Sequence, residues 1–102
     1  MRYQRHKYNA IRSEADNIKF DSKKEMKYYL ELKLRVKAGE IIFFLLQTPF
    51  NLPGNVKYRV DFQEFHKDGT VHFIDVKGME TSEFKLKKKQ VEALYPVKIE
   101  IV

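Results

Sequence analysis

Two aspartates interrupt apolar segments that have the composition of β-strands. Asp61 lies within residues 58–62, Asp75 lies within residues 73–76, and Lys77 follows Asp75 by two positions. Burying a carboxylate in an apolar strand costs free energy unless the carboxylate is paired or binds a metal ion. The two aspartates and the lysine are therefore candidates for a metal-dependent site.

The turn between the two segments decides whether the aspartates meet. Residues 67–69 read Lys-Asp-Gly, and a three-residue loop with its glycine in the left-handed conformation is a common hairpin connection. That loop pairs Asp61 with Asp75 on one face, about 5 Å apart at Cβ, and Lys77 shares the face. A two-residue Asp-Gly turn would place Asp61 opposite Val76 instead. The sequence permits both, and we favour the loop that brings the charged residues together.

This constellation suits phosphodiester hydrolysis. Two acidic oxygens and a backbone carbonyl can hold Mg²⁺ with waters still attached, and the metal activates a water and neutralises phosphate charge. Mn²⁺ should substitute, since it also accepts oxygen ligands. Lys77 could hold or deprotonate the attacking water. The structural alternative is a cross-strand ion pair between the aspartates and either Arg59 or Lys77.

The elements that position these residues follow from the pattern of apolar and turn residues, which predicts two helices and four strands in the order α-β-β-β-α-β. The helices span residues 22–38 and 82–94, and the strands span residues 41–46, 56–65, 71–76 and 97–102. Residues 41–46 are apolar on both faces and are predicted to be a buried strand, with Phe43 and Phe44 in the core. Pro49, Pro53 and Gly54 predict a loop after it.

The chain is basic, with 20 Lys and Arg against 14 Asp and Glu and a net charge of +6. Such an excess favours polyanionic partners, although it equally serves solubility. Residues 1–20 are predicted to be a basic arm with little regular structure, before a domain over residues 21–102. The candidate nucleic-acid contacts are Arg2, Arg5 and Lys7 on the arm and Lys85, Lys88 and Lys89 on the second helix.

Those helix lysines have two interpretations. Lys88 shares a helical stripe with Phe84 and Val91, which predicts that it points inward to a phosphate. Lys85 and Lys89 are expected to meet DNA phosphates, and the alternative is a face that meets only water.

Composition excludes several other classes of site. The chain has no cysteine, so disulfides, thiolate zinc sites and a cysteine nucleophile are excluded. We find no signal peptide and no apolar run long enough to span a membrane. We expect a cytoplasmic protein with no membrane partner and no small-molecule cofactor.

The arrangement resembles the PD-(D/E)XK nuclease superfamily, and residues 7–102 resemble a small phage-encoded family of resolvase-like, or recombination, endonucleases. The segments that carry the closer likeness are residues 7–9, 20–25, 38–41, 47, 61–62, 75–78 and 84–89. The superfamily's proline before the first aspartate is Val60 here.

The resemblance implies a restriction-endonuclease-like domain with a mixed four-stranded sheet flanked by two helices. It implies that Asp61, Asp75, Lys77 and Glu25 are catalytic, with the three acids as metal ligands. It also implies an Mg²⁺-dependent endodeoxyribonuclease that acts on branched DNA in phage recombination or replication, in a bacterial cytoplasm. Resolving a four-way junction takes two symmetric cuts, so a homodimer is expected.

Two residues keep a structural alternative. Glu25 completes a capping box with Ser22, and from the residues alone capping is as plausible as metal binding. Gln47 ends an apolar strand, where it either reaches the site or caps the sheet edge, and we favour the edge. For the whole chain, the rival functions are a non-catalytic DNA-binding module with the same fold and a protein–protein adaptor in a phage replisome.

Overall fold

Four strands form the central sheet of a computed structural model that describes residues 13–102. Their order is β3 (Ile41–Leu52), β4 (Val56–His66), β5 (Val71–Asp75) and β6 (Ile99–Ile101). The first three are antiparallel neighbours, and β6 runs parallel to β5. The predicted α/β class, the mixed sheet and the α-β-β-β-α-β order are confirmed.

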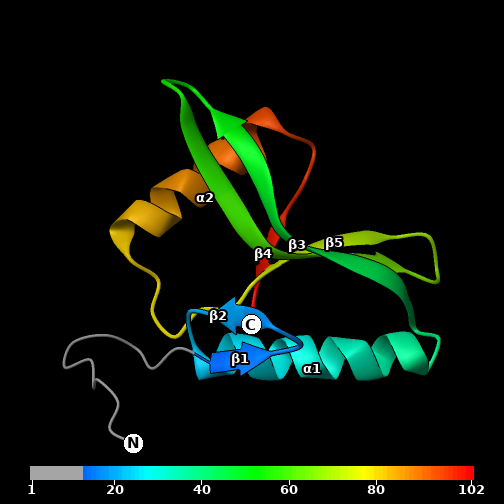
Figure 1. The fold of residues 1–102 in the computed structure, drawn as a ribbon. Helices are drawn as coiled ribbons and strands as arrows, with labels where there is room; N and C mark the ends of the chain where they lie inside the picture. Colours follow the sequence, from blue (N-terminus) through cyan, green and yellow to red (C-terminus); the bar gives the residue numbers. More distant parts are fainter. Residues whose placement is uncertain (1–12) are drawn as a thin grey trace, which may run out of the picture.

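Two helices lie at separate places along the sheet (Figure 1), and each contributes side chains to its own hydrophobic core. Helix α1 (Lys23–Lys37) contributes Tyr29 and Leu32 to the first core, together with Phe62 and Ile74 of the sheet. Helix α2 (Ser82–Leu94) contributes to the second core, whose buried members are Phe50, Leu52, Tyr58, Val60, Phe84, Val91 and Ile99. No helix among the described residues is long and apolar enough to cross a membrane.

The ends of both helices follow the predicted signals. The Ser22 side chain accepts a hydrogen bond from the Glu25 amide at 3.1 Å, as an N-cap residue does. Gly39 follows α1 with a φ of 84°, a left-handed conformation that glycine adopts at little cost. Thr81 caps α2 by accepting from the Phe84 amide. The Ser22 cap fixes where α1 begins, and therefore where Glu25 lies.

The β4–β5 hairpin has the three-residue loop that we favoured. Gly69 has a φ of 90° and its amide donates to the carbonyl oxygen of His66 at 3.0 Å. The strands pair Phe62 with Ile74. One further step in that register places Asp61 opposite Asp75, as the three-residue loop requires.

Strand β3 differs from the prediction in length and in burial. It continues through Pro49 to Leu52, so the loop is confined to the turn around Gly54. A proline is tolerated there because β3 is an edge strand and needs no donor on its outer side. Edge placement also overturns the prediction that Phe43 is a core residue: it is 46% exposed and stacks on Phe65 at 4.3 Å between ring centroids.

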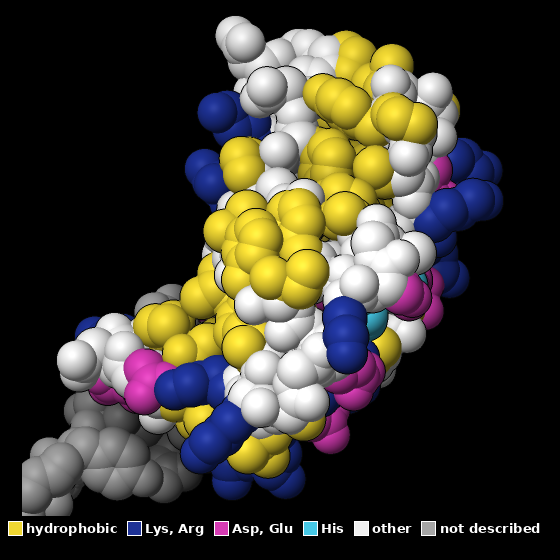
Figure 2. All heavy atoms as spheres, turned by 90° about the vertical axis from the view of Figure 1, so that its right-hand side faces the viewer, with side chains coloured by type: hydrophobic (Ala, Val, Ile, Leu, Met, Phe, Trp, Pro, Cys, Tyr) yellow, Lys and Arg dark blue, Asp and Glu magenta, His cyan; other side chains and the backbone are white. Residues whose placement is uncertain are grey.

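Other apolar side chains of β3 are exposed too, among them Ile42 and Leu45. Figure 2 shows hydrophobic side chains gathered over the middle of one side of the molecule, with Lys and Arg side chains along its margins. The prediction of a strand buried on both faces was therefore wrong.

Residues 13–20 are not part of an irregular arm. They form a hairpin of β1 (Ser13–Ala15) and β2 (Ile18–Phe20) that contacts α1. Asp16 and Asn17 make its turn with φ values of 52° and 65°, which asparagine and aspartate tolerate better than most residues. Phe20 is buried in the first core. The rest of the predicted arm, residues 1–12, lies outside the described residues.

Candidate active site

Asp61 and Asp75 hold each other in place through the backbone. The Asp61 amide donates to Asp75 Oδ1 at 3.0 Å, and the Val76 amide donates to Asp61 Oδ2 at 2.9 Å. Each aspartate thus uses one carboxylate oxygen to bond the opposite strand just beyond the last regular pair of the ladder. The second oxygen of each side chain remains for other partners.

Glu25 reaches the same place from the first turn of α1. Its carboxylate is buried, and Gln47 Nε2 lies 3.3 Å from Glu25 Oε2 and 3.3 Å from Asp61 Oδ1. The capping interpretation of Glu25 holds only for its backbone, whose amide binds Ser22. Its carboxylate faces the aspartate site, so α1, β3 and β4 all contribute to the cluster.

Gln47 is the residue whose role we misjudged. It has a φ of 53°, an uncommon conformation for a residue other than glycine. The pairs Leu46–Phe62 and Thr48–Val60 flank it, and Phe62 and Val60 belong to different cores. Figure 1 shows β3 and β4 changing direction together partway along their length. This bend brings the Gln47 amide to the carboxylates rather than to the sheet edge.

The environment disfavours charge on all three acids. Burial, assisted by the neighbouring Asp61 and Asp21 carboxylates and opposed by the charge of Lys77, raises the pKa of Glu25 to about 7. Burial also raises the pKa of Asp61 and of Asp75, while a backbone amide and Lys77 act in the opposite direction. A bound cation would stabilise the charged form of all three carboxylates.

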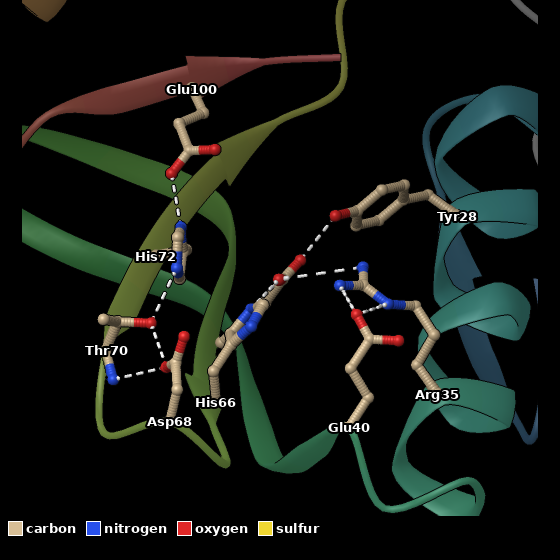
Figure 3. Close-up of polar contacts among 9 residues, drawn as sticks. Tyr28, Arg35, Glu40, His66, Asp68, Thr70, His72 and Glu100 are labelled. Carbon is tan, nitrogen blue, oxygen red and sulfur yellow. Dashed lines mark hydrogen bonds and ion pairs between the residues drawn. The ribbon is translucent and has the colours of Figure 1, made fainter.

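A buried carboxylate outside this cluster shows how a structural acid is partnered in this chain. Glu64 is 1% exposed, and its carboxylate contacts the hydroxyl of Tyr28, Nε2 of His66 and the guanidinium of Arg35. Figure 3 shows these three labelled side chains directed at the carboxylate, which is drawn without a label. Asp75 is also 1% exposed, yet its Oδ2 has no hydrogen-bond partner among the described residues. A buried acceptor without a partner is costly, so a ligand that bound Asp75 Oδ2 would remove that cost.

Lys77 lies beside the acids without bonding them. Its Nζ is 4.7 Å from the centroid of the Phe84 ring, and its charge lowers the pKa of Glu25, Asp61 and Asp75. Among residues 13–102, no ion pair joins Lys77 or Arg59 to either aspartate. The cross-strand ion pair that we considered as an alternative is therefore not formed there.

The donor set fits a hydrated divalent cation better than a closed cage. Within the part of the chain that is described, no three His, Asp or Glu side chains form a ready-made metal cluster. Mg²⁺, however, keeps several waters and is often held by only one or two carboxylates. Asp75 Oδ2 has no partner in the described part of the chain, and the bond from Gln47 to Asp61 Oδ1 is long at 3.3 Å. These two oxygens, with Glu25 nearby, suit Mg²⁺ or Mn²⁺.

The predicted DNA contacts are distributed unevenly. Lys85 and Lys89 are exposed on α2, open to a phosphate backbone. Lys88 is half-buried and pairs with Glu92 of its own helix at 3.3 Å, so its ammonium does not join the carboxylate cluster. Arg2, Arg5 and Lys7 fall outside the described residues.

Comparison with known proteins identifies the family of this chain but no activity for it. No curated protein and no solved structure matches the sequence significantly. A family described as "Protein of unknown function (DUF1064)" matches residues 5–101, nearly the whole chain. The chain therefore belongs to the DUF1064 family.

Proposed function

We propose that this protein is a metal-dependent DNA endonuclease of the PD-(D/E)XK type, with the restriction-endonuclease-like fold that its element order suggests. The observation that carries the proposal is the buried Oδ2 of Asp75, which lies beside Asp61 and Glu25 and has no hydrogen-bond partner within residues 13–102. A structural carboxylate would be partnered as Glu64 is. A carboxylate that binds a cation needs a free oxygen.

Each residue then has a defined task. Asp75, Asp61 and Glu25 would hold Mg²⁺, and the bound metal would supply an acidified water and neutralise phosphate charge. Gln47 would orient Glu25 and Asp61 through its amide. The ammonium of Lys77 lowers the pKa of all three acids. It would hold the attacking water or a phosphate oxygen.

The substrate and setting rest on charge and on the family likeness drawn from the sequence. The net charge of +6 favours DNA. We propose branched DNA as the substrate, a homodimer for paired cuts, and a role in phage recombination or replication in a bacterial cytoplasm.

The test is cleavage of labelled four-way junction, flap and duplex DNA with Mg²⁺ or Mn²⁺. Wild type should cut, and Asp75→Asn, which keeps the size of the side chain, should not. Asp68→Asn is the matched control, because Asp68 lies on the same hairpin but in its exposed turn. Light scattering on the free and DNA-bound protein would test the homodimer.

Two rival functions predict different results. DNA binding that falls steeply with salt, without cutting by either protein, would support the non-catalytic DNA-binding module. Weak binding that salt hardly changes would support the replisome adaptor.

A further inference from the structure

A pocket that Lys77 helps to line opens at the N-terminal end of α2. It has a volume of about 230 Å³, and its lining residues are Tyr58, Lys77, Thr81, Glu83, Phe84 and Lys87. They come from β4, from the segment after β5 and from the first turns of α2. Because Lys77 lines this pocket and also acts on the carboxylates, the two sites adjoin.

Tyr58 gives the pocket an unmet hydrogen bond. The residue is 7% exposed, and its hydroxyl is buried without a partner among the described residues. Its ring packs against Phe84 at 6.1 Å between centroids. The other tyrosine hydroxyls among residues 13–102 are bonded, and that of Tyr95 donates to the Asn51 carbonyl at 2.7 Å. A buried hydroxyl normally has such a partner, so the Tyr58 hydroxyl can donate to a ligand.

The charges around the pocket select an anion. Helix α2 has 13 residues, and the first amides of a helix point out of its N-terminus, where its dipole favours negative charge. Lys77 and Lys87 add two cations on flexible side chains. Glu83 is the opposing charge: its carboxylate pairs with Lys87 at 3.1 Å, but it is exposed and can turn into solvent. An oxyanion with several acceptor atoms would satisfy the hydroxyl, the amides and the lysines together.

We propose that this pocket binds a phosphate group of a nucleic-acid strand and so anchors the strand beside the carboxylate site. The choice of nucleic acid as the source of the phosphate rests on the proposed function, whereas the phosphate chemistry rests on the pocket alone. Lys77 is placed to span the anchored phosphate and the carboxylates.

The experiment measures binding without cleavage, in EDTA and without divalent metal. Inorganic phosphate is titrated into the isotope-labelled full chain and followed by NMR. A single-stranded oligonucleotide is titrated separately and followed by fluorescence anisotropy. Tyr58→Phe removes only the hydroxyl and keeps the ring on Phe84, and Tyr95→Phe is the matched control. Thermal melting checks that both variants fold.

We expect phosphate to shift the amide signals of Ser82 and Glu83, and Tyr58→Phe to weaken both phosphate and oligonucleotide binding by ~10-fold, the usual loss for one hydrogen bond to a charged group. Tyr95→Phe should bind as wild type does. Lys87→Met should weaken binding, and Lys37→Met, at the far end of α1, should not.

Three results would overturn the inference: no shift of the α2 amides with phosphate, unchanged phosphate affinity in Tyr58→Phe, or lost phosphate affinity with unchanged oligonucleotide affinity. Because no metal is present, a failure of the nuclease proposal leaves these readouts intact. If the protein cleaves DNA but Tyr58→Phe binds phosphate and oligonucleotide as wild type does, the pocket inference fails and the nuclease proposal stands.

Discussion

Replacing Glu25 with glutamine should stabilise the metal-free protein at pH 8 and change its stability little at pH 4. The folded protein raises the pKa of Glu25 from 4.5 to about 7, chiefly through burial. Between these values the folded state binds the proton more tightly than the unfolded state, so this group's contribution to stability is complete below pH 4.5 and is lost as pH rises through 7. Glutamine is neutral throughout and avoids that loss.

The size of the effect follows from the shift. A rise from 4.5 to about 7 corresponds to about 3 kcal/mol of unfolding free energy at pH 8. Glutamine can still occupy the third helical position and leaves the Ser22 cap intact, since that bond uses the backbone amide. The gain should therefore appear in the pH dependence, with an intermediate value at pH 6.

The assay is urea denaturation of both proteins at pH 4, 6 and 8 in EDTA, with the difference taken at each pH so that other titrating groups cancel. Glu31→Gln is the control, because Glu31 is exposed on the same helix and should show no such trend. A gain in unfolding free energy that is equal at pH 4 and pH 8, or absent at pH 8, would refute the claim that burial destabilises the charged form of Glu25.

Three further results are expected. Mg²⁺ should raise the melting temperature of wild type at pH 8, because ligands that bind only the folded state stabilise it, and it should do so much less for Asp75→Asn; calorimetry with and without metal measures this. Gln47→Gly, which keeps the bend but removes the amide, should reduce cleavage in a gel assay while preserving the circular dichroism spectrum; full activity would exclude a positioning role. Lys85→Ala and Lys89→Ala should each lower DNA affinity and reduce the slope of log affinity against log salt by about 1, whereas Lys37→Ala should do neither in anisotropy titrations.

The sequence located the hairpin that carries the aspartates but permitted two registers, and only the chemistry of the paired aspartates favoured the register that the structure has. Gly69 closes a loop whose length sets the register, and register alone decides that Asp61 faces Asp75. Ser22, Gly39 and Thr81 likewise mark helix ends through local chemistry. Such features depend on residues that are close together in the sequence, so they can be predicted from the sequence.

Other features depend on tertiary packing and could not be predicted in the same way. An apolar run looks the same in a central strand and in an edge strand, so the exposure of Phe43 was not foreseen. The three-residue strands β1 and β2 carry too few residues for a periodic pattern. The bend at Gln47, with its positive φ, has no signal beyond a polar residue after an apolar run.

The pocket at Tyr58 is a further case. Its lining residues are separated by up to 29 positions along the chain, from Tyr58 to Lys87, and no local motif links them. Only the packing of α2 on β4 brings them together.

The most direct test of the central claim is the single-turnover cleavage rate of four-way junction DNA at pH 8 with Mg²⁺, at protein concentrations that saturate the DNA. Wild type and Asp68→Asn should cut at similar rates, and Asp75→Asn should be slower by more than ~100-fold, since loss of a metal ligand should exceed the 10–100-fold effect of outer-shell residues. Cleavage by Asp75→Asn at the wild-type rate would contradict the claim that Asp75 holds the catalytic metal.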